Sequence, residues 1–337
     1  MDIKELIFSL TNADSLGHID YAQKTAKAEL SKYCEVKELG GLSFCGTLKG
    51  EKDYTLMLDA HIDEVGFIVT DVDENGFLTV SKCGGADLRC LPAKRVKIYG
   101  KQLVHGTFCS VPPHLSSGNQ EFTDIADFKI DTGLGKNAKE IISVGDYAVS
   151  DITAVSLLGD RVNAKALDDR SGVVCLLELA KRLSGKNLPF NVTFLFSDGE
   201  ELGLRGAIPA TYEISPDEAI AVDVSFGDGP QIAPHECGNL GCGGMVGFSP
   251  ILNREISKTL INIAEEYNIP YQIEAMGGKT GTNSDAISVS KSGVKTGLVS
   301  IPLRNMHTAA EVLDLGDVIS VCDLLEKYIL LGGTKNV

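Results

Sequence analysis

Two adjacent glutamates, Glu200 and Glu201, follow closely after an apolar run at 190–197. The run contains Val and Thr and has the length of a buried strand, and Asp198 with Gly199 interrupts it. The carboxylate pair is therefore expected at the C-terminal end of a strand, where open α/β sheets bind their ligands. Two neighbouring carboxylates repel each other unless a cation neutralises them or one of them holds a proton.

Other strand ends and helix starts in this chain carry further side chains that can bind a metal ion. Because the carboxyl ends of parallel strands meet at one edge of a sheet, such residues converge even when they are far apart in sequence. Histidine nitrogens together with carboxylate oxygens suit Zn, Co or Mn. The carboxylates outnumber what one tetrahedral ion needs, which favours two ions about 3.5–4 Å apart with a shared carboxylate. The residues are His61 and Asp63 after a strand at 54–59, Asp168 and Asp169 at a helix start, Asp223 in a strand at 219–224, and His307 after a strand at 293–301.

Each of these residues has an ordinary explanation when it is taken alone. A lone Glu-Glu pair is more often a solvated turn, and a single histidine after a strand is more often a satisfied core or surface residue. Asp168 could simply cap a helix. Four of the six histidines lie outside the pattern, so the metal-site hypothesis depends on the residues jointly.

The elements that must position these residues predict an α/β fold. Apolar strands alternate with segments whose hydrophobic residues recur at helical spacing. The predicted helices cover 3–10, 21–33, 171–183, 253–267 and 318–331, with one more beginning at Leu202.

The middle of the chain has a different character. From about Phe67, short apolar segments follow one another with turn signals between them, and 69–80 predicts a hairpin. Closely spaced short strands favour a small barrel or sandwich. We therefore expect one α/β domain made of 1–66 and 165–337, interrupted by a β-rich insertion at 67–164.

Composition limits the classes of function that are open to the chain. Its 337 residues are 43% hydrophobic and 23% charged, as in globular proteins, and the formal charge of −15 argues against nucleic acid or an anionic membrane as a partner. The nine cysteines are scattered, with no Cys-x-x-Cys pair, which favours a reducing compartment. No apolar run is long enough for a transmembrane helix, and the N-terminus lacks the features of a signal peptide. The sequence predicts a cytoplasmic protein.

Four segments are similar to the signature blocks of the tetrahedral aminopeptidase family, which comprises glutamyl, leucyl and deblocking aminopeptidases with two metal ions. The resemblance covers nearly the whole chain. It implies a three-layer α/β/α metallopeptidase domain with a mostly parallel sheet and an inserted barrel-like dimerisation domain. It also implies a homo-oligomer built from dimers, up to a dodecamer. The four segments are 60–66, 165–170, 199–206 and 301–307.

The same resemblance implies a role for each candidate residue and two divalent metal ions per chain, Zn or Co, with Mn as a further option. His61 and Asp223 would hold one metal, Glu201 and His307 the other, and Asp168 both. Glu200 would be the general base, and Asp63 would orient His61.

The implied reaction is the release of N-terminal residues from peptides with a free N-terminus. A water molecule between the two metals would be the nucleophile, and Glu200 would take its proton. One alternative is a related two-metal deacylase or carboxypeptidase, which would need a cationic group for a substrate carboxylate. The other is a non-catalytic assembly protein of the same fold, against which the complete set of ligands argues. Gly199, Asn305 and Ala309 depart from the family's usual residues, and these departures bear on loop geometry and substrate preference because none is a ligand.

Overall fold

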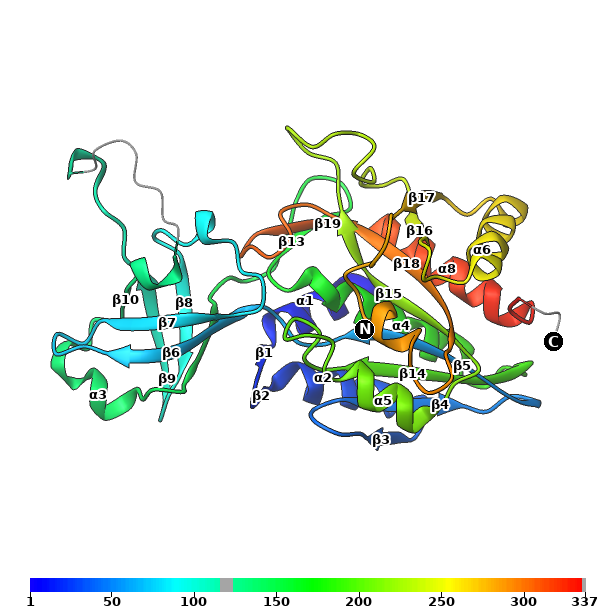
Figure 1. The fold of residues 1–337 in the computed structure, drawn as a ribbon, viewed down its shortest axis with the longest axis horizontal. Helices are drawn as coiled ribbons and strands as arrows, with labels where there is room; N and C mark the ends of the chain where they lie inside the picture. The colour runs from blue at the N-terminus through cyan, green and yellow to red at the C-terminus, as the bar shows by residue number, and fades with distance from the viewer. Residues whose placement is uncertain (116–123, 335–337) are drawn as a thin grey trace.

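The computed structural model describes residues 1–115 and 124–334. Figure 1 shows a larger domain, in which helices cover a sheet, and a small β-rich domain at one end of the long axis. The small domain is built from the middle of the sequence, and both ends of the chain lie in or near the larger domain (Figure 1).

Within the described residues, the large sheet has eight strands. The central strands of the order below are mutually parallel, which brings their carboxyl ends to one edge. Antiparallel pairs occur towards both sides of the sheet. The order is β17 (Tyr271–Ala275), β16 (Gly244–Phe248), β18 (Lys295–Leu303), β15 (Glu218–Phe226), β5 (Lys52–His61), β14 (Phe190–Ser197), β4 (Phe44–Leu48) and β3 (Val36–Glu38).

Both faces of this sheet are buried, which explains why its central strands are apolar at nearly every position. In β5, Leu56 and Leu58 pack in the core on one face, whereas Met57 between them packs in the core on the other. In β14, Phe194 and Leu195 are divided between the two faces in the same way. The period of two residues is that of a strand.

Helices cover the two faces unequally and complete three layers. One face carries α1 (Ile3–Asn12), α2 (Tyr21–Leu30), α4 (Leu167–Leu183), α6 (Arg254–Tyr267) and α8 (Leu315–Leu330). The other carries α5 (Ala207–Ile214) and α7 (Ser284–Ile287). The predicted α/β/α layering is confirmed.

The small domain is a closed antiparallel barrel, one of the two architectures that its closely spaced short strands predicted. Its core contains Phe67, Phe108 and Phe128, whose rings meet edge to face with centroids 5.1 and 6.0 Å apart. Around the barrel the order is β10 (Ile130–Asp131), β7 (Leu78–Cys83), β6 (Gly66–Val72), β11 (Tyr147–Ser150), β8 (Arg95–Tyr99) and β9 (Leu103–Phe108), and β9 pairs again with β10.

Shorter elements complete the described chain. β12 (Val155–Ser156), β13 (Arg161–Ala164) and β19 (Glu311–Asp314) form a small sheet, and β1 (Ser15–Leu16) pairs with β2 (Ile19–Asp20). α3 (Ala138–Ile141) lies within the insertion, and 3₁₀ turns occupy Leu88–Cys90, Pro113–Leu115, Ile125–Asp127 and Gly135–Asn137.

A buried cluster of charges fixes the barrel to the α/β domain. Asp14 accepts hydrogen bonds from Lys97 Nζ at 2.9 Å and from the Tyr99 hydroxyl, both on barrel strand β8. Asp14 also lies 2.9 Å from Nζ of Lys165, which lies 2.5 Å from Glu64. The two domains therefore meet through paired charges, of which Asp14, Lys165 and Glu64 are buried and Lys97 is 18% exposed.

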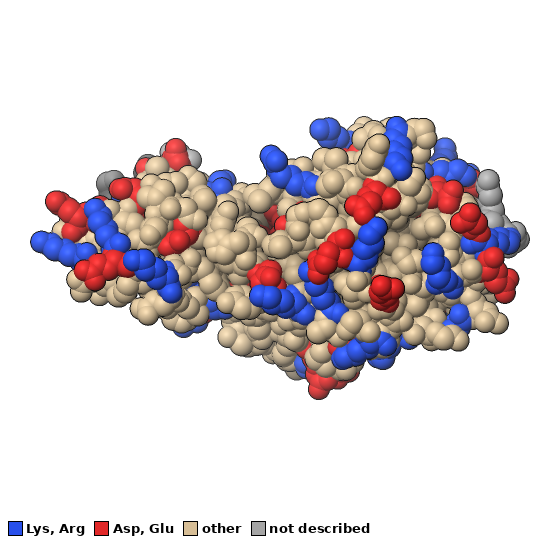
Figure 2. All heavy atoms as spheres, turned by 90° about the horizontal axis from the view of Figure 1, so that it is seen from below, with Lys and Arg blue, Asp and Glu red and all other residues tan. Residues whose placement is uncertain are grey.

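Figure 2 shows one face on which basic and acidic side chains are interspersed over both domains, with no continuous basic area on that face. Among the described residues, no helix combines the length and the apolar character needed to cross a bilayer.

One predicted helix start is wrong. The segment after Glu201 forms turns, with Gly203 and Leu204 at φ angles of 102° and 60°, and α5 begins only at Ala207. The N–H groups of Gly203 and Leu204 both donate to the Glu200 carbonyl at 2.9 Å. These turns hold both glutamates at the end of the strand instead of carrying them onto a helix.

Candidate metal centre

The parallel strands bring the candidate residues to one edge of the sheet. His61 is the last residue of β5, the glutamate pair follows β14, and Asp223 lies near the end of β15. His307 follows β18, and Asp168 lies in the first turn of α4, where its backbone departs from helical angles.

The carboxylate of Asp168 lies between the two histidines. Its Oδ1 is 3.0 Å from Nε2 of His61, and its Oδ2 is 3.2 Å from Nε2 of His307. The same His307 nitrogen is 3.2 Å from Oε1 of Glu201, and the His61 nitrogen is 3.9 Å from Oδ1 of Asp223. One carboxylate thus faces two groups, each made of a histidine and a second acid.

Asp63 supports both the histidine and the glutamate pair. Its Oδ1 lies 3.4 Å from Nδ1 of His61, the ring nitrogen that faces away from Asp168. Its two oxygens accept the backbone N–H groups of Glu200 and Glu201 at 3.0 and 3.2 Å. A single buried carboxylate therefore lies next to three candidate residues.

Negative charge dominates the cluster and shifts the pKa values of its members. Burial raises the pKa of Glu200 to about 7, and Glu201 acts in the same direction, whereas His61 lowers it. Burial also raises the pKa of Asp223 well above its ordinary value. Hydrogen bonds to Asp168 and Glu201 raise the pKa of His307 to about 11. Burial thus favours the neutral form of the two acids, and the neighbouring carboxylates favour the charged form of His307.

The donor set fits divalent cations. Ligand atoms of His61, Asp168 and Glu201 lie within 4.8 Å of one another, as do those of His61, Asp169 and Asp223. Imidazole and carboxylate groups are the ligands that Zn, Co and Mn accept. Both histidines direct Nε2 at the cluster while Nδ1 faces a polar oxygen, which is the usual arrangement of metal-binding histidine.

Comparison with known proteins now decides the family. A family model described as M42 glutamyl aminopeptidase matches residues 43–324. This chain belongs to the M42 glutamyl aminopeptidase family.

Individual relatives agree with that assignment. A lysyl aminopeptidase of Pyrococcus furiosus is 30% identical over 284 residues, which cover 81% of each chain. A glutamyl aminopeptidase of Lactococcus lactis is 28% identical over 333 residues, covering 93% of this chain and 91% of the relative. The solved TET1 peptidase of Pyrococcus horikoshii, 28% identical, superposes with a TM-score of 0.87 over 98% of this chain and 99% of its own. The prediction of a metal-dependent aminopeptidase is confirmed, and neither alternative is favoured.

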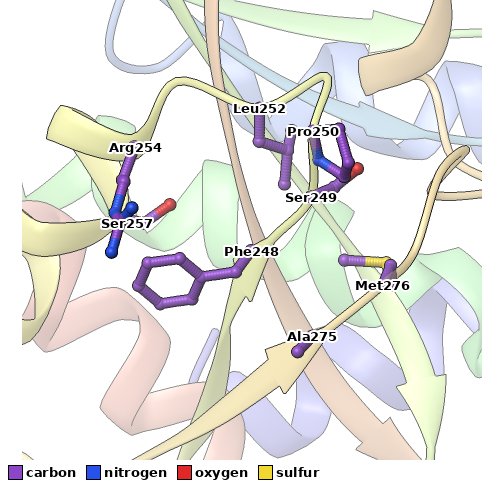
Figure 3. Close-up of a pocket in the computed structure, with 8 residues that line it drawn as sticks. All are labelled: Phe248, Ser249, Pro250, Leu252, Arg254, Ser257, Ala275 and Met276. Carbon is purple, nitrogen blue, oxygen red and sulfur yellow. The ribbon is translucent and has the colours of Figure 1, made fainter.

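The M42 chain has a cavity beside the candidate ligands. Its volume is about 570 Å³, and its lining includes His61, Asp168, Glu201, Asp223 and His307. Ser225, Glu274, Met276 and Lys279 also line it. Met276 also borders a neighbouring hollow of about 440 Å³, in which it faces Phe248 and Leu252 (Figure 3).

Two buried acids at this site, Glu311 and Asp169, were given no role by the sequence analysis. Glu311 accepts the N–H groups of Leu167 at 2.7 Å, Asp168 at 3.2 Å and His307 at 2.9 Å. Asp169 accepts the N–H of Gly172 at 2.9 Å and that of His61 at 3.2 Å. Asp169 caps the helix as expected, whereas Asp168 turns to the histidines. The only sequence signal for Glu311 was an acid four residues after His307.

Proposed function

We propose that this chain is a dinuclear metallo-aminopeptidase that removes residues one at a time from the free N-terminus of peptides, with Glu200 as general base. The observation that carries the proposal is the Asp168 carboxylate, whose two oxygens lie 3.0 and 3.2 Å from two different histidines. Such a carboxylate can be shared by two cations, and the cavity beside it has room for a substrate residue.

The proposed ligand sets follow the contacts in the cluster. His61 and Asp223 hold one cation, Glu201 and His307 hold the other, and Asp168 contributes one oxygen to each. Zn or Co is the proposed metal, with Mn as a further option, because all three accept mixed nitrogen and oxygen ligands. Asp63 keeps His61 in orientation and fixes the backbone of both glutamates.

Glu200 moves the proton in the proposed reaction. When bound, the two cations polarise the scissile carbonyl and lower the pKa of a water molecule at the site. Glu200 lines the cavity and takes the proton of the attacking water, then returns it to the leaving amine. Burial raises the pKa of Glu200, which makes this carboxylate a better proton acceptor than an exposed one.

The proposed substrate is a peptide with a free amino terminus. The cavity is lined by several carboxylates, including Glu200, Asp223 and Glu274, which outnumber the cationic Lys279 in the same lining. This excess of carboxylates favours an amine over a second acidic group. We also propose a location in the cytoplasm, because nine free cysteines fit a reducing compartment.

The proposed assembly is a homo-oligomer of dimers, up to a dodecamer, with the insertion at 67–164 as the dimerisation domain and 1–66 with 165–337 as the catalytic domain. Support comes from the TET1 peptidase of Pyrococcus horikoshii, which can assemble into a tetrahedron or a large octahedral shell. The barrel projects from one end of the α/β domain (Figure 1), which leaves it accessible to another copy.

A pair of peptides tests the function. A short peptide and its N-acetylated counterpart are incubated separately with the metal-loaded enzyme, and product masses are followed with time. Stepwise shortening of the free peptide alone is expected. Equal cleavage of the acetylated peptide would exclude an aminopeptidase and leave a general amidase.

A further inference from the structure

The turn that follows barrel strand β7 lies against His307. The carbonyl oxygen of Gly85 is 3.3 Å from Nδ1 of that ring. A carbonyl oxygen only accepts hydrogen bonds, so Nδ1 carries the proton and the lone pair of the neutral ring is on Nε2. Nε2 faces Asp168 and Glu201. The Gly85 carbonyl therefore selects the tautomer that a metal ligand at this place requires.

The segment that contains this turn also contacts the backbone of His307. The side chain of His307 is not fully buried, so burial alone does not fix its position. The Asp87 N–H donates to the His307 carbonyl at 3.3 Å. His307 has a left-handed φ of 61°, which is uncommon for a residue with a side chain. Its side chain is 31% exposed, whereas that of His61 is 2% exposed. The ring of His307 depends on specific contacts in a way that the ring of His61 does not.

The turn requires glycine because the proposed metal ligands His307 and Glu201 lie close to its backbone. A Cβ atom at Gly85 would come within 2.6 Å of His307 Nδ1, far inside contact distance. A Cβ atom at Gly84, where φ is 81°, would come within 2.9 Å of Cγ1 of Val65 and within 3.2 Å of both Cβ and Oε2 of Glu201. The two glycines thus lie against the two ligands proposed for one cation, His307 and Glu201.

We propose that the Gly84–Gly85 turn is a positioning element of the metal centre, so that the barrel insertion completes the site of the chain into which it is inserted; this proposal rests on the dinuclear function proposed above. The alternative is that the two glycines only make the connection between the two domains flexible. The buried charges of Asp14, Lys97 and Lys165 fix the barrel beside the α/β domain, so the turn is held where it meets His307.

The test is a titration of Co²⁺ into metal-free protein, followed by absorption and calorimetry. Wild type, Gly85→Ala and Gly40→Ala are compared. Gly40 is the matched control because a Cβ atom there meets nothing within 4 Å and its φ is not left-handed. Wild type and Gly40→Ala should bind two ions per chain with equal affinities. Gly85→Ala should bind one of them about 10- to 100-fold more weakly, the usual effect of losing a group that orients a ligand.

The thermal unfolding of the metal-free proteins separates positioning from folding. Gly85→Ala should unfold like Gly40→Ala before metal is added, and Gly84→Ala, which acts on Glu201, provides an independent second variant. Equal Co²⁺ affinities in all variants would overturn the positioning role and leave the dinuclear function intact. Failure of wild type to bind two ions would overturn both proposals. If neither glycine variant folds, the turn is a structural contact and the proposal is likewise overturned.

Discussion

Glu200 and Glu201 are neighbours in sequence, yet their surroundings differ. Both line the cavity, but Glu201 lies 3.2 Å from Nε2 of His307, and burial raises the pKa of Glu200 to about 7. A base of this kind works above its pKa, where it is deprotonated, and its activity is lost as the pH falls through that value. Bound cations act in the opposite direction and lower the pKa.

The pH dependence of kcat/KM should therefore show an acid limb at or below about pH 7, with unit slope. Measurement of kcat/KM with a short free peptide from about pH 8 down to the pH at which the metals dissociate checks this, with metal occupancy measured at each pH as the control. A profile that stays flat over this whole range with the metals retained would contradict the role of Glu200.

At the scale of single residues, the sequence could predict those that combine a chemical group with a place at a strand end. His61, Asp168, Glu201 and His307 were found in that way and lie together in the structure. Gly85 could not be found, because it acts through a backbone carbonyl on a residue 222 positions away. No local pattern carries that information.

At the scale of elements, Lys165 lies between strand β13 and helix α4 and pairs with Asp14, the residue that contacts barrel strand β8. Its side chain is 2% exposed and pairs with Asp14 and Glu64, which are equally buried. Removing one member of a buried group of charges leaves the others uncompensated, at a cost of about 3–5 kcal/mol.

Lys165→Met should therefore lower the free energy of unfolding by about 3–5 kcal/mol in a urea titration of the metal-free protein. Lys181→Met is the matched control. That lysine is 45% exposed and pairs with Glu178 at 2.9 Å, so the change should stay within about 0.5 kcal/mol. Equal effects of the two substitutions would show that the cluster does not hold the domains together.

The prediction of elements succeeded where burial produces a regular pattern of hydrophobic residues. It failed where the backbone angles of a turn determine where the next helix begins. The strand at 190–197 was predicted with its observed bounds, because both faces of β14 are buried. The helix expected at Leu202 begins at Ala207, because Gly203 and Leu204 adopt left-handed angles. Gly199 has a φ of 75°, a conformation that glycine adopts without strain.

At the scale of the whole molecule, the barrel joins the α/β domain through neighbouring strands. Phe67 pairs with Ala148 and Ile68 with Tyr147, so the entering and leaving segments are antiparallel partners. Such partners lie about 5 Å apart, which a short linker can span. The texture of the sequence predicted the barrel, but the pairing of β10 with both β7 and β9, which closes it, depends on contacts between distant segments.

Replacing residues 67–150 by a short linker should give a folded protein with fewer chains per particle, because the insertion is the proposed dimerisation domain. Light scattering on a sizing column measures the number of chains, and circular dichroism checks the fold. An unchanged number of chains per particle would remove the assembly role. The variant also lacks Gly85, so it should bind Co²⁺ more weakly than the full-length chain.

The most direct test of the central claim separates metal binding from proton transfer at the two glutamates. Glu200→Gln and Glu201→Gln are each assayed for peptide hydrolysis and analysed for bound metal by elemental analysis. Glu200→Gln should lose about 10²- to 10⁴-fold in kcat and keep two metal ions per chain, whereas Glu201→Gln should lose metal together with activity. An active Glu200→Gln enzyme, or a Glu201→Gln enzyme that keeps both ions, would contradict the account.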